Sequence, residues 1–274
     1  YGADVRLEVV CGSRSGLFDA NGLDADQFDA LEPGLSGPDF ISTSGADVLI
    51  EAGPSDFRTG GPGLAYIHSA LSVGRDTIVI SKGALVHSGR ELRDLAKVSG
   101  AILKLSGASA AALPTIDLVE HSLTGCRVLS VEGILNATTN FLLDAMISKG
   151  VGFDAALKEA QKGGFAEADT RNDTEGWDTA CKLLLLANFG LGAELAMDDL
   201  VVEGIHGVTA DRIDAWRAYP NSDPLAQVSG KNKAIRIITD AMGETIAIGC
   251  GEEPLATAAA ALKDFEHILK AKTS

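Results

Sequence analysis

The stretch Asp47-Val48-Leu49-Ile50-Glu51-Ala52-Gly53-Pro54 decides the fold of the first half of the chain. Its apolar run predicts a strand, and the Gly-Pro turn that follows leads to a helix over residues 62–71. Residues 77–80 (Thr-Ile-Val-Ile) predict a second strand. A strand, a crossover helix and another strand in this order form a parallel βαβ unit.

The pattern continues on both sides of this unit. Residues 5–10 read as an earlier strand, residues 90–99 as a helix and residues 101–105 as a further strand. Short apolar strands that alternate with helices predict a parallel sheet covered on both faces. No G-x-G-x-x-G follows any of these strands, although a dinucleotide fold ordinarily opens with one. We therefore expect an α/β, Rossmann-like doubly wound parallel sheet without its first strand and glycine loop.

Ser13 and Arg14 follow the first predicted strand, which corresponds to the second strand of such a fold. The residue at the tip of that strand reads the adenosine ribose, and an Arg there accepts the 2′-phosphate of NADP. These two residues thus favour NADP over NAD as the cofactor. The alternative is a surface turn with a solvated Arg.

The second half of the chain has a different character, beginning near Leu113-Pro114. The expected helices cover residues 114–122, 138–149, 153–162, 174–189, a segment beginning at Ala210, and 254–270; the expected strands cover 127–135, 234–239 and 245–248. We assign residues 1–113, completed by the C-terminal helix 254–274, to a nucleotide-binding domain. Residues 114–253 form the second, α+β domain.

Composition excludes several classes of function. The chain has 23 Lys and Arg against 38 Asp and Glu, a net charge of −15, which disfavours nucleic acid as a partner. The longest apolar runs are far shorter than the ~18 residues of a membrane span. The four Cys and five His show no metal-ligand spacing, so we expect no metal site. The N-terminal residues have no signal-peptide pattern, which together with scattered Cys indicates a cytoplasmic protein.

The most informative stretch for chemistry is GGFAEADTRNDTEGWDTACK, residues 163–182. It is rich in acids, and Lys182 then opens an apolar helix, one helical turn after Asp178. A Lys at the edge of such a helix is partly desolvated and suited to proton transfer. The alternative is a surface ion pair, which contributes about 0.3–0.5 kcal/mol at this spacing. The spacing alone leaves both interpretations open.

This stretch resembles the signature of homoserine dehydrogenases. The matching residues are Ala160, Gly164, Phe165, Ala166, Glu167, Asp169, Asp173, Gly176, Asp178 and Lys182. The block EGILNATTNF at residues 132–141 is similar to the family's EGILNGTTNY. Residues 47–54, 81–83 and 223–226 are further matching blocks, so the resemblance covers nearly the whole chain.

The resemblance implies an enzyme that reduces L-aspartate 4-semialdehyde to L-homoserine with NADPH or NADH, in the threonine and methionine branch of amino-acid biosynthesis. It also implies a homodimer formed through the second domain, which binds substrate. Lys182 is then the proton donor, Asp178 orients it, and Lys82 is a rival donor. The implied substrate-binding residues are Glu167, Asp173 and Thr138. The implied cofactor-binding residues are Gly53, Pro54, Ser81, Lys82 and Gly251, in addition to Ser13 and Arg14.

The chain also departs from the family pattern. Ser106 stands where the family has the Glu that holds a monovalent cation, so that metal site is not expected. Glu252 and Glu253 replace part of a glycine loop near the nicotinamide, and the chain is short around residues 218–219. No regulatory domain is expected after residue 274. Three alternatives stay open: a dehydrogenase of another amino aldehyde or hydroxy acid, a protein that has lost cofactor binding, and a purely structural dimer module. The acid-Lys cluster at residues 163–182 argues against the third.

Overall fold

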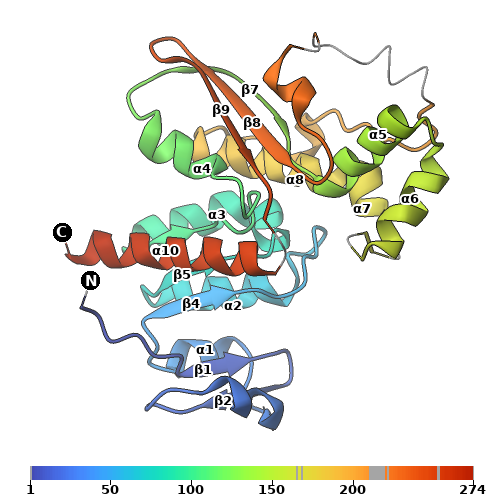
Figure 1. Ribbon diagram of the computed structural model, residues 1–274. Coiled ribbons are helices and arrows are strands. Elements are labelled where there is room, and N and C mark those ends of the chain that lie inside the picture. The colour runs from blue at the N-terminus through green and yellow to red at the C-terminus, as the bar shows by residue number, and fades with distance from the viewer. Residues whose placement is uncertain are drawn as a thin grey trace. The chain divides into compact units, whose positions relative to one another are not determined.

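The computed structural model describes residues 2–164, 166–167, 169–209, 220, 222–251 and 254–273. The chain forms two compact units, Tyr1–Ala108 with Pro254–Ser274, and Ser109–Glu253. Figure 1 shows the elements of both units along the chain. The nucleotide-binding and substrate-binding roles assigned to the two predicted domains stay predictions.

The first unit contains a parallel sheet of β4 (Val48–Glu51), β5 (Asp76–Val79) and β6 (Leu103–Lys104), in that order. Helix α2 (Gly61–Ser72) connects β4 to β5, and α3 (Gly83–Ser99) connects β5 to β6. The predicted parallel βαβ pattern and the mixed α/β, Rossmann-like fold class are therefore confirmed. Helix α3 begins before the predicted helix 90–99 and contains a kink at Ser88, whose backbone is not helical.

All four residues of β5 are buried, so both faces of this strand are covered. Ile78 packs against Ala261 and Ile268 of the C-terminal helix α10 (Leu255–Thr273). Asp264 of the same helix accepts hydrogen bonds from the backbone N–H and the hydroxyl of Ser106 at 2.8 and 2.6 Å. The last helix thus completes the core of the first unit (Figure 1).

The expectation that residues 5–10 join the parallel sheet is wrong. The strands β1 (Val9–Cys11), β2 (Ser15–Phe18) and β3 (Glu32–Pro33) form a separate antiparallel sheet. The short helix η1 (Ala25–Ala30) lies between β2 and β3 in the chain, and α1 (Pro38–Thr43) follows β3. The Gly12 N–H donates to the Ser15 carbonyl at 2.8 Å, which closes a tight turn and brings β2 beside β1. Since β2 supplies backbone partners for β1, the apolar run forms a hairpin instead.

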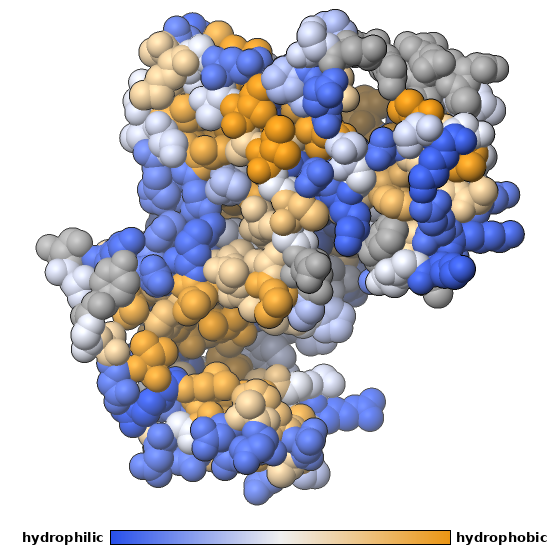
Figure 2. Space-filling model, in the orientation of Figure 1, coloured by the Kyte–Doolittle hydropathy of each residue, from blue (hydrophilic) through white to orange (hydrophobic). Residues whose placement is uncertain are grey.

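The second unit contains an antiparallel sheet of β7 (Val128–Ile134), β8 (Lys233–Thr239) and β9 (Gly243–Gly249), in that order. The strands predicted over residues 127–135, 234–239 and 245–248 are thereby confirmed. Apolar side chains are exposed on two of these strands and on the turn that joins β8 to β9: Leu129 and Ile248 are each 55% exposed, and Met242 in the turn is 60% exposed. Figure 2 shows such apolar residues on the surface of this unit.

The other elements described in the second unit are helices. They are α4 (Thr115–Asp117), η2 (Leu118–Ser122), α5 (Ala137–Lys149), α6 (Phe153–Lys162), α7 (Arg171–Thr174), α8 (Trp177–Leu185), η3 (Leu186–Gly190), η4 (Met197–Asp199) and η5 (Pro224–Gln227). The core between α5 and α6 contains Leu142, Met146, Ala156 and Ala160. This packing fixes the start of α5, which carries part of the site.

The helix predicted over residues 174–189 is divided into α7, α8 and η3. Gly176 causes the first division because its φ is +90°, a conformation that side chains disfavour. A Cβ at Gly176 would lie 3.0 Å from the Glu203 carbonyl oxygen. The resulting elbow separates Asp173 on α7 from Asp178 on α8. The predicted helix at Ala210 and residues 218–219 lie outside the described residues.

Membrane insertion through a helix finds no support in the described part of the chain. No helix there combines the length and the apolar character that crossing a bilayer requires.

Candidate active site

An ion pair on α8 is the centre of the candidate site. The Lys182 Nζ lies 2.5 Å from Asp178 Oδ2, and it donates a second hydrogen bond to the Leu135 carbonyl oxygen at 3.0 Å. Both charged side chains are only 13% exposed. The pair is therefore not a solvated surface pair, because most of its surroundings are protein.

Lys182 retains hydrogen-bonding capacity. An ammonium group has three N–H donors, and the Asp178 carboxylate and the Leu135 carbonyl accept two of them. The third has no partner among the residues that the structure describes. Lys182 can therefore donate to an oxygen of a bound molecule without breaking either existing contact.

Asn136 connects two carboxylates of the site. Its side-chain Nδ2 donates to Asp173 Oδ1 at 2.6 Å and to Asp178 Oδ2 at 2.8 Å. Its Oδ1 accepts from the Thr139 backbone N–H at 2.9 Å, so Asn136 also caps the N-terminus of α5. Sequence reasoning missed this residue as a site residue. Its position at a helix start inside the block 132–141 was the available signal.

Asp173 is a partly buried carboxyl group whose pKa is shifted. Burial raises its pKa above the ordinary value, and the negative charge of Asp178 acts in the same direction. Hydrogen bonds from Asn136 and Thr138 and the charge of Lys182 oppose the shift. Two carboxylates and one ammonium leave an excess negative charge when both acids are ionised. The cluster thus suits a ligand that carries a positive group.

The structure does not bring Glu167 into this cluster. Its side chain is exposed and forms no hydrogen bond or ion pair with any described residue, while its backbone carbonyl accepts from Gln161 Nε2 at 3.2 Å. Nearby, Asp169 pairs with Arg171 at 2.5 Å, and the hydrogen bonds from Arg171 lower the pKa of Asp169 to about 2. Phe165 and Ala168 lie outside the described residues.

The predicted cofactor residues of the first unit gather at the carboxyl ends of β4 and β5. Glu51 is buried and accepts from the Gly53 N–H at 2.7 Å and from the Ser81 hydroxyl at 2.5 Å. The Lys82 N–H donates to Ser55 Oγ at 2.9 Å, and Pro54 lies between these contacts in the sequence. One buried carboxylate therefore joins the loops that follow the two strands.

Gly83 allows these loops to approach closely. A Cβ at Gly83 would lie 2.5 Å from the Asp56 backbone nitrogen, which no side chain tolerates. The carboxyl ends of parallel strands are the ordinary place for a dinucleotide in an open α/β sheet. Gly53, Pro54, Ser81 and Lys82 thus fit that location.

The remaining predicted cofactor residues lie elsewhere. Ser13 and Arg14 are exposed in the turn between β1 and β2, and the Arg14 carbonyl accepts from the Gly34 N–H at 3.0 Å. Gly251 follows β9 in the second unit. Glu252 and Glu253 lie outside the described residues.

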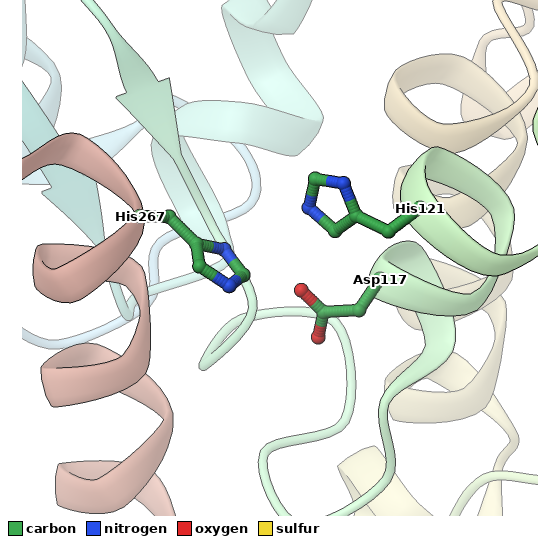
Figure 3. Close-up of side chains that lie close together, drawn as sticks. All are labelled: Asp117, His121 and His267. Atoms are coloured by element: carbon green, nitrogen blue, oxygen red, sulfur yellow. The ribbon is translucent and has the colours of Figure 1, made fainter. Parts of the chain in front are cut away.

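Figure 3 draws three side chains with metal-binding atoms, Asp117, His121 and His267. Asp117 and His121 belong to α4 and η2 of the second unit, whereas His267 belongs to α10 of the first. Because the three residues are divided between the two units, we assign no metal site to them.

Comparison with known proteins gives a consistent result. The family model for homoserine dehydrogenase matches residues 114–219 and 215–265. The homoserine dehydrogenase of Methanocaldococcus jannaschii is 34% identical over 85% of this chain and 76% of its own length. A Pseudomonas canavaninivorans relative, named an NAD(+)-dependent homoserine dehydrogenase, is 31% identical over 85% of this chain and 74% of its own. A crystal structure of an Archaeoglobus fulgidus protein named after the same family matches with a TM-score of 0.86 and 30% identity, covering 96% of this chain and 88% of that one.

Proposed function

The chain belongs to the homoserine dehydrogenase family, and from that premise we propose that it reduces L-aspartate 4-semialdehyde to L-homoserine with a nicotinamide cofactor. One observation carries the proposal. The Lys182 ammonium is held by Asp178 and Leu135 and has one N–H left to donate. A reduction of an aldehyde needs a proton donor at the carbonyl oxygen, and this group can provide it.

Lys182 acts on the oxygen of the substrate aldehyde. The cofactor, when bound, supplies the hydride. Negative charge then develops on the aldehyde oxygen, and the Lys182 N–H stabilises that charge and transfers its proton. The product hydroxyl keeps that proton, and the neutral amine regains one from solvent. Asp178 holds Nζ in place through the ion pair at 2.5 Å, so that the remaining N–H can point at the aldehyde oxygen.

The acids around Lys182 bind the amino end of the substrate. Asp173 and Asp178 together leave excess negative charge beside Thr138, which suits the ammonium group of an amino acid. Asn136 keeps the two carboxylates at a fixed separation. We include Glu167 as a further substrate contact, on the basis of the family signature alone.

The cofactor is bound by the loops at the carboxyl ends of β4 and β5. Gly53, Pro54, Ser81 and Lys82 line this edge, and the buried Glu51 fixes both loops. Ser13, Arg14 and Gly251 are additional proposed contacts. We propose NADP on the residue type of Arg14 alone, because β1 pairs with β2 and lies outside the parallel sheet. The Pseudomonas canavaninivorans relative is named NAD(+)-dependent. Lys82 is the rival proton donor.

Three finer assignments complete the proposal. The reaction belongs to the threonine and methionine branch of amino-acid biosynthesis and takes place in the cytoplasm. The protein acts as a homodimer through its second unit. The exposed apolar side chains of Leu129 and Ile248 on the β7–β9 sheet, and of Met242 in the turn that joins β8 to β9, support this interface.

The direct test is an assay of aldehyde reduction with purified protein. We expect L-aspartate 4-semialdehyde to be reduced with NADPH and NADH, and homoserine to be oxidised in reverse. Turnover of another amino aldehyde in preference would support a related dehydrogenase. The absence of both turnover and NADPH binding by calorimetry would support the alternative that cofactor binding is lost.

A further inference from the structure

We propose that the ammonium of Lys233 replaces the monovalent cation that family resemblance places on the loop after β6. Lys233 is the first residue of β8 and is 7% exposed. Its Nζ donates a hydrogen bond to the Ala110 carbonyl oxygen at 3.1 Å. The loop thus already has a positive charge, covalently attached to the protein. This inference depends on family membership and not on which aldehyde is reduced.

The loop that receives Lys233 is buried and tightly turned. Ser109, Ala110 and Leu113 are at most 2% exposed. Ala110 and Ala111 have φ angles of 148° and 49°, which non-glycine residues rarely adopt. The Ala110 carbonyl also accepts from the Leu113 N–H at 3.2 Å. Such backbone conformations persist only where the surrounding structure holds the loop in place.

The sheet explains how Lys233 reaches this loop. Lys233 pairs with Gly249 in the β8–β9 register, at the end of the sheet where β8 begins and β9 ends. A Cβ at Gly249 would lie 3.1 Å from the Ala112 carbonyl oxygen, so the loop packs directly against this end. The strand pair therefore presents the Lys233 side chain to the carbonyl groups of the loop.

The residues present do not fit a bound metal ion. Ser106 supplies no negative charge at the position of the family's Glu, and within its own unit its hydroxyl donates to Asp264 Oδ1 at 2.6 Å. In the second unit, an alkali cation at the Ala110 carbonyl would lie close to the Lys233 ammonium. Like charges at such a distance repel in a poorly solvated site. We therefore derive no step of the reaction through a metal ion.

A primary ammonium can substitute for an alkali cation because both carry one positive charge and both bind carbonyl oxygens. A tethered ammonium loses no translational freedom on binding and does not depend on salt. The prediction is that neither Na⁺ nor K⁺ specifically stabilises or activates this protein.

The test is the melting temperature of the wild type in NaCl, KCl and choline chloride at equal ionic strength. We expect the three values to agree. In choline chloride, Lys233→Met should lower the melting temperature by roughly 2–10 °C, because the buried Ala110 carbonyl loses one of its two donors and the loop loses its positive charge. The matched control is Lys231→Met, which removes an exposed charge two residues earlier and should change little.

Two results would overturn the inference. One is a higher melting temperature of the wild type in NaCl or KCl than in choline chloride, with broadening of the ²³Na resonance by the protein. The other is a Lys233→Met variant whose melting temperature in choline chloride equals that of Lys231→Met. If Lys233→Met does not fold, the melting temperatures of the wild type in the three salts still test the inference. Lys233→Arg should then fold, because it keeps the positive charge. The melting measurements need no substrate. A protein without activity would therefore contradict the proposed function but would not alter the melting temperatures that test the role of Lys233.

Discussion

The side-chain amide of Asn136 donates a hydrogen bond to Asp173 Oδ1 over 2.6 Å. This contact joins the N-terminus of α5 to α7, and the second hydrogen of the same amide reaches Asp178 on α8. One residue thus connects three helices at the point where Lys182 is held. We therefore expect Asn136 to contribute both to the stability of the fold and to the reaction.

Replacement of Asn136 separates its two roles. Ser caps a helix as well as Asn does, but it is too short to bridge two carboxylates. We expect Asn136→Ser to lower kcat and to reduce the free energy of unfolding by about 1–3 kcal/mol through the lost hydrogen bonds. Asn136→Ala should have the same kcat and lose about 1 kcal/mol more, since the cap is also removed. Urea unfolding and steady-state kinetics measure both; equal stability of the two variants would contradict the capping role.

The raised pKa of Asp173 gives the protein a defined pH dependence. The folded state binds this proton more tightly than the unfolded state, so the stabilising contribution is present at low pH. It is lost as the pH rises from about 4, the ordinary Asp value, through the raised pKa of the folded protein. The stability of the wild type relative to Asp173→Asn should therefore decrease across this window. Thermal melting between acid and neutral pH measures it, and a relative stability that increases with pH would refute the assignment.

Gly83 is predicted to control cofactor binding through the loops after β4 and β5. Gly83→Ala forces these loops apart, because the new Cβ would lie 2.5 Å from the Asp56 nitrogen. We expect a loss of about 1–3 kcal/mol in stability and a raised KM for the cofactor, with little change in KM for the aldehyde. Gly152→Ala is the control, since its Cβ would meet no atom within 4 Å. An unchanged cofactor KM in Gly83→Ala would remove these loops from the cofactor site.

Glu167 is predicted to bind the substrate ammonium. Glu167→Gln should raise KM for the aldehyde more than it lowers kcat, because the charge contact exists in both the ground state and the transition state. Glu175→Gln changes a neighbouring exposed acid outside the proposed site and should leave KM unaltered. If both variants keep the wild-type KM, Glu167 is an exposed surface residue that does not contact the substrate.

Sequence reasoning worked where local pattern and tertiary structure agree. The apolar runs at β4 and β5 predicted the parallel sheet, and the β8–β9 hairpin and α6 follow from equally local signals. The prediction that residues 5–10 join the parallel sheet was wrong, because the sequence of a strand does not specify which other strand pairs with it. The turn at Gly12 gave β1 an adjacent antiparallel partner that the apolar pattern does not encode.

The candidate site was predictable in part for the same reason. The helical spacing of Asp178 and Lys182 is local, and it correctly places them on one face of α8. The contact between Asn136 and Asp173 joins residues 37 positions apart, and no periodicity reports such a pair. The left-handed conformation of Gly176 divides the predicted helix, and this elbow also depends on the approach of Glu203.

If Lys182 donates the proton, its loss should appear in kcat of Lys182→Ala for L-aspartate 4-semialdehyde. We expect kcat to decrease by about 10²–10⁴, which is typical for the loss of a positioned general acid, and the circular dichroism spectrum to show a retained fold. Lys149→Ala is the control, because Lys149 forms an exposed pair with Glu159 at 2.5 Å and should keep full turnover. Lys82→Ala tests the rival donor in the same assay. A Lys182→Ala enzyme with wild-type kcat, together with a Lys82→Ala enzyme without turnover, would show that Lys82 and not Lys182 donates the proton.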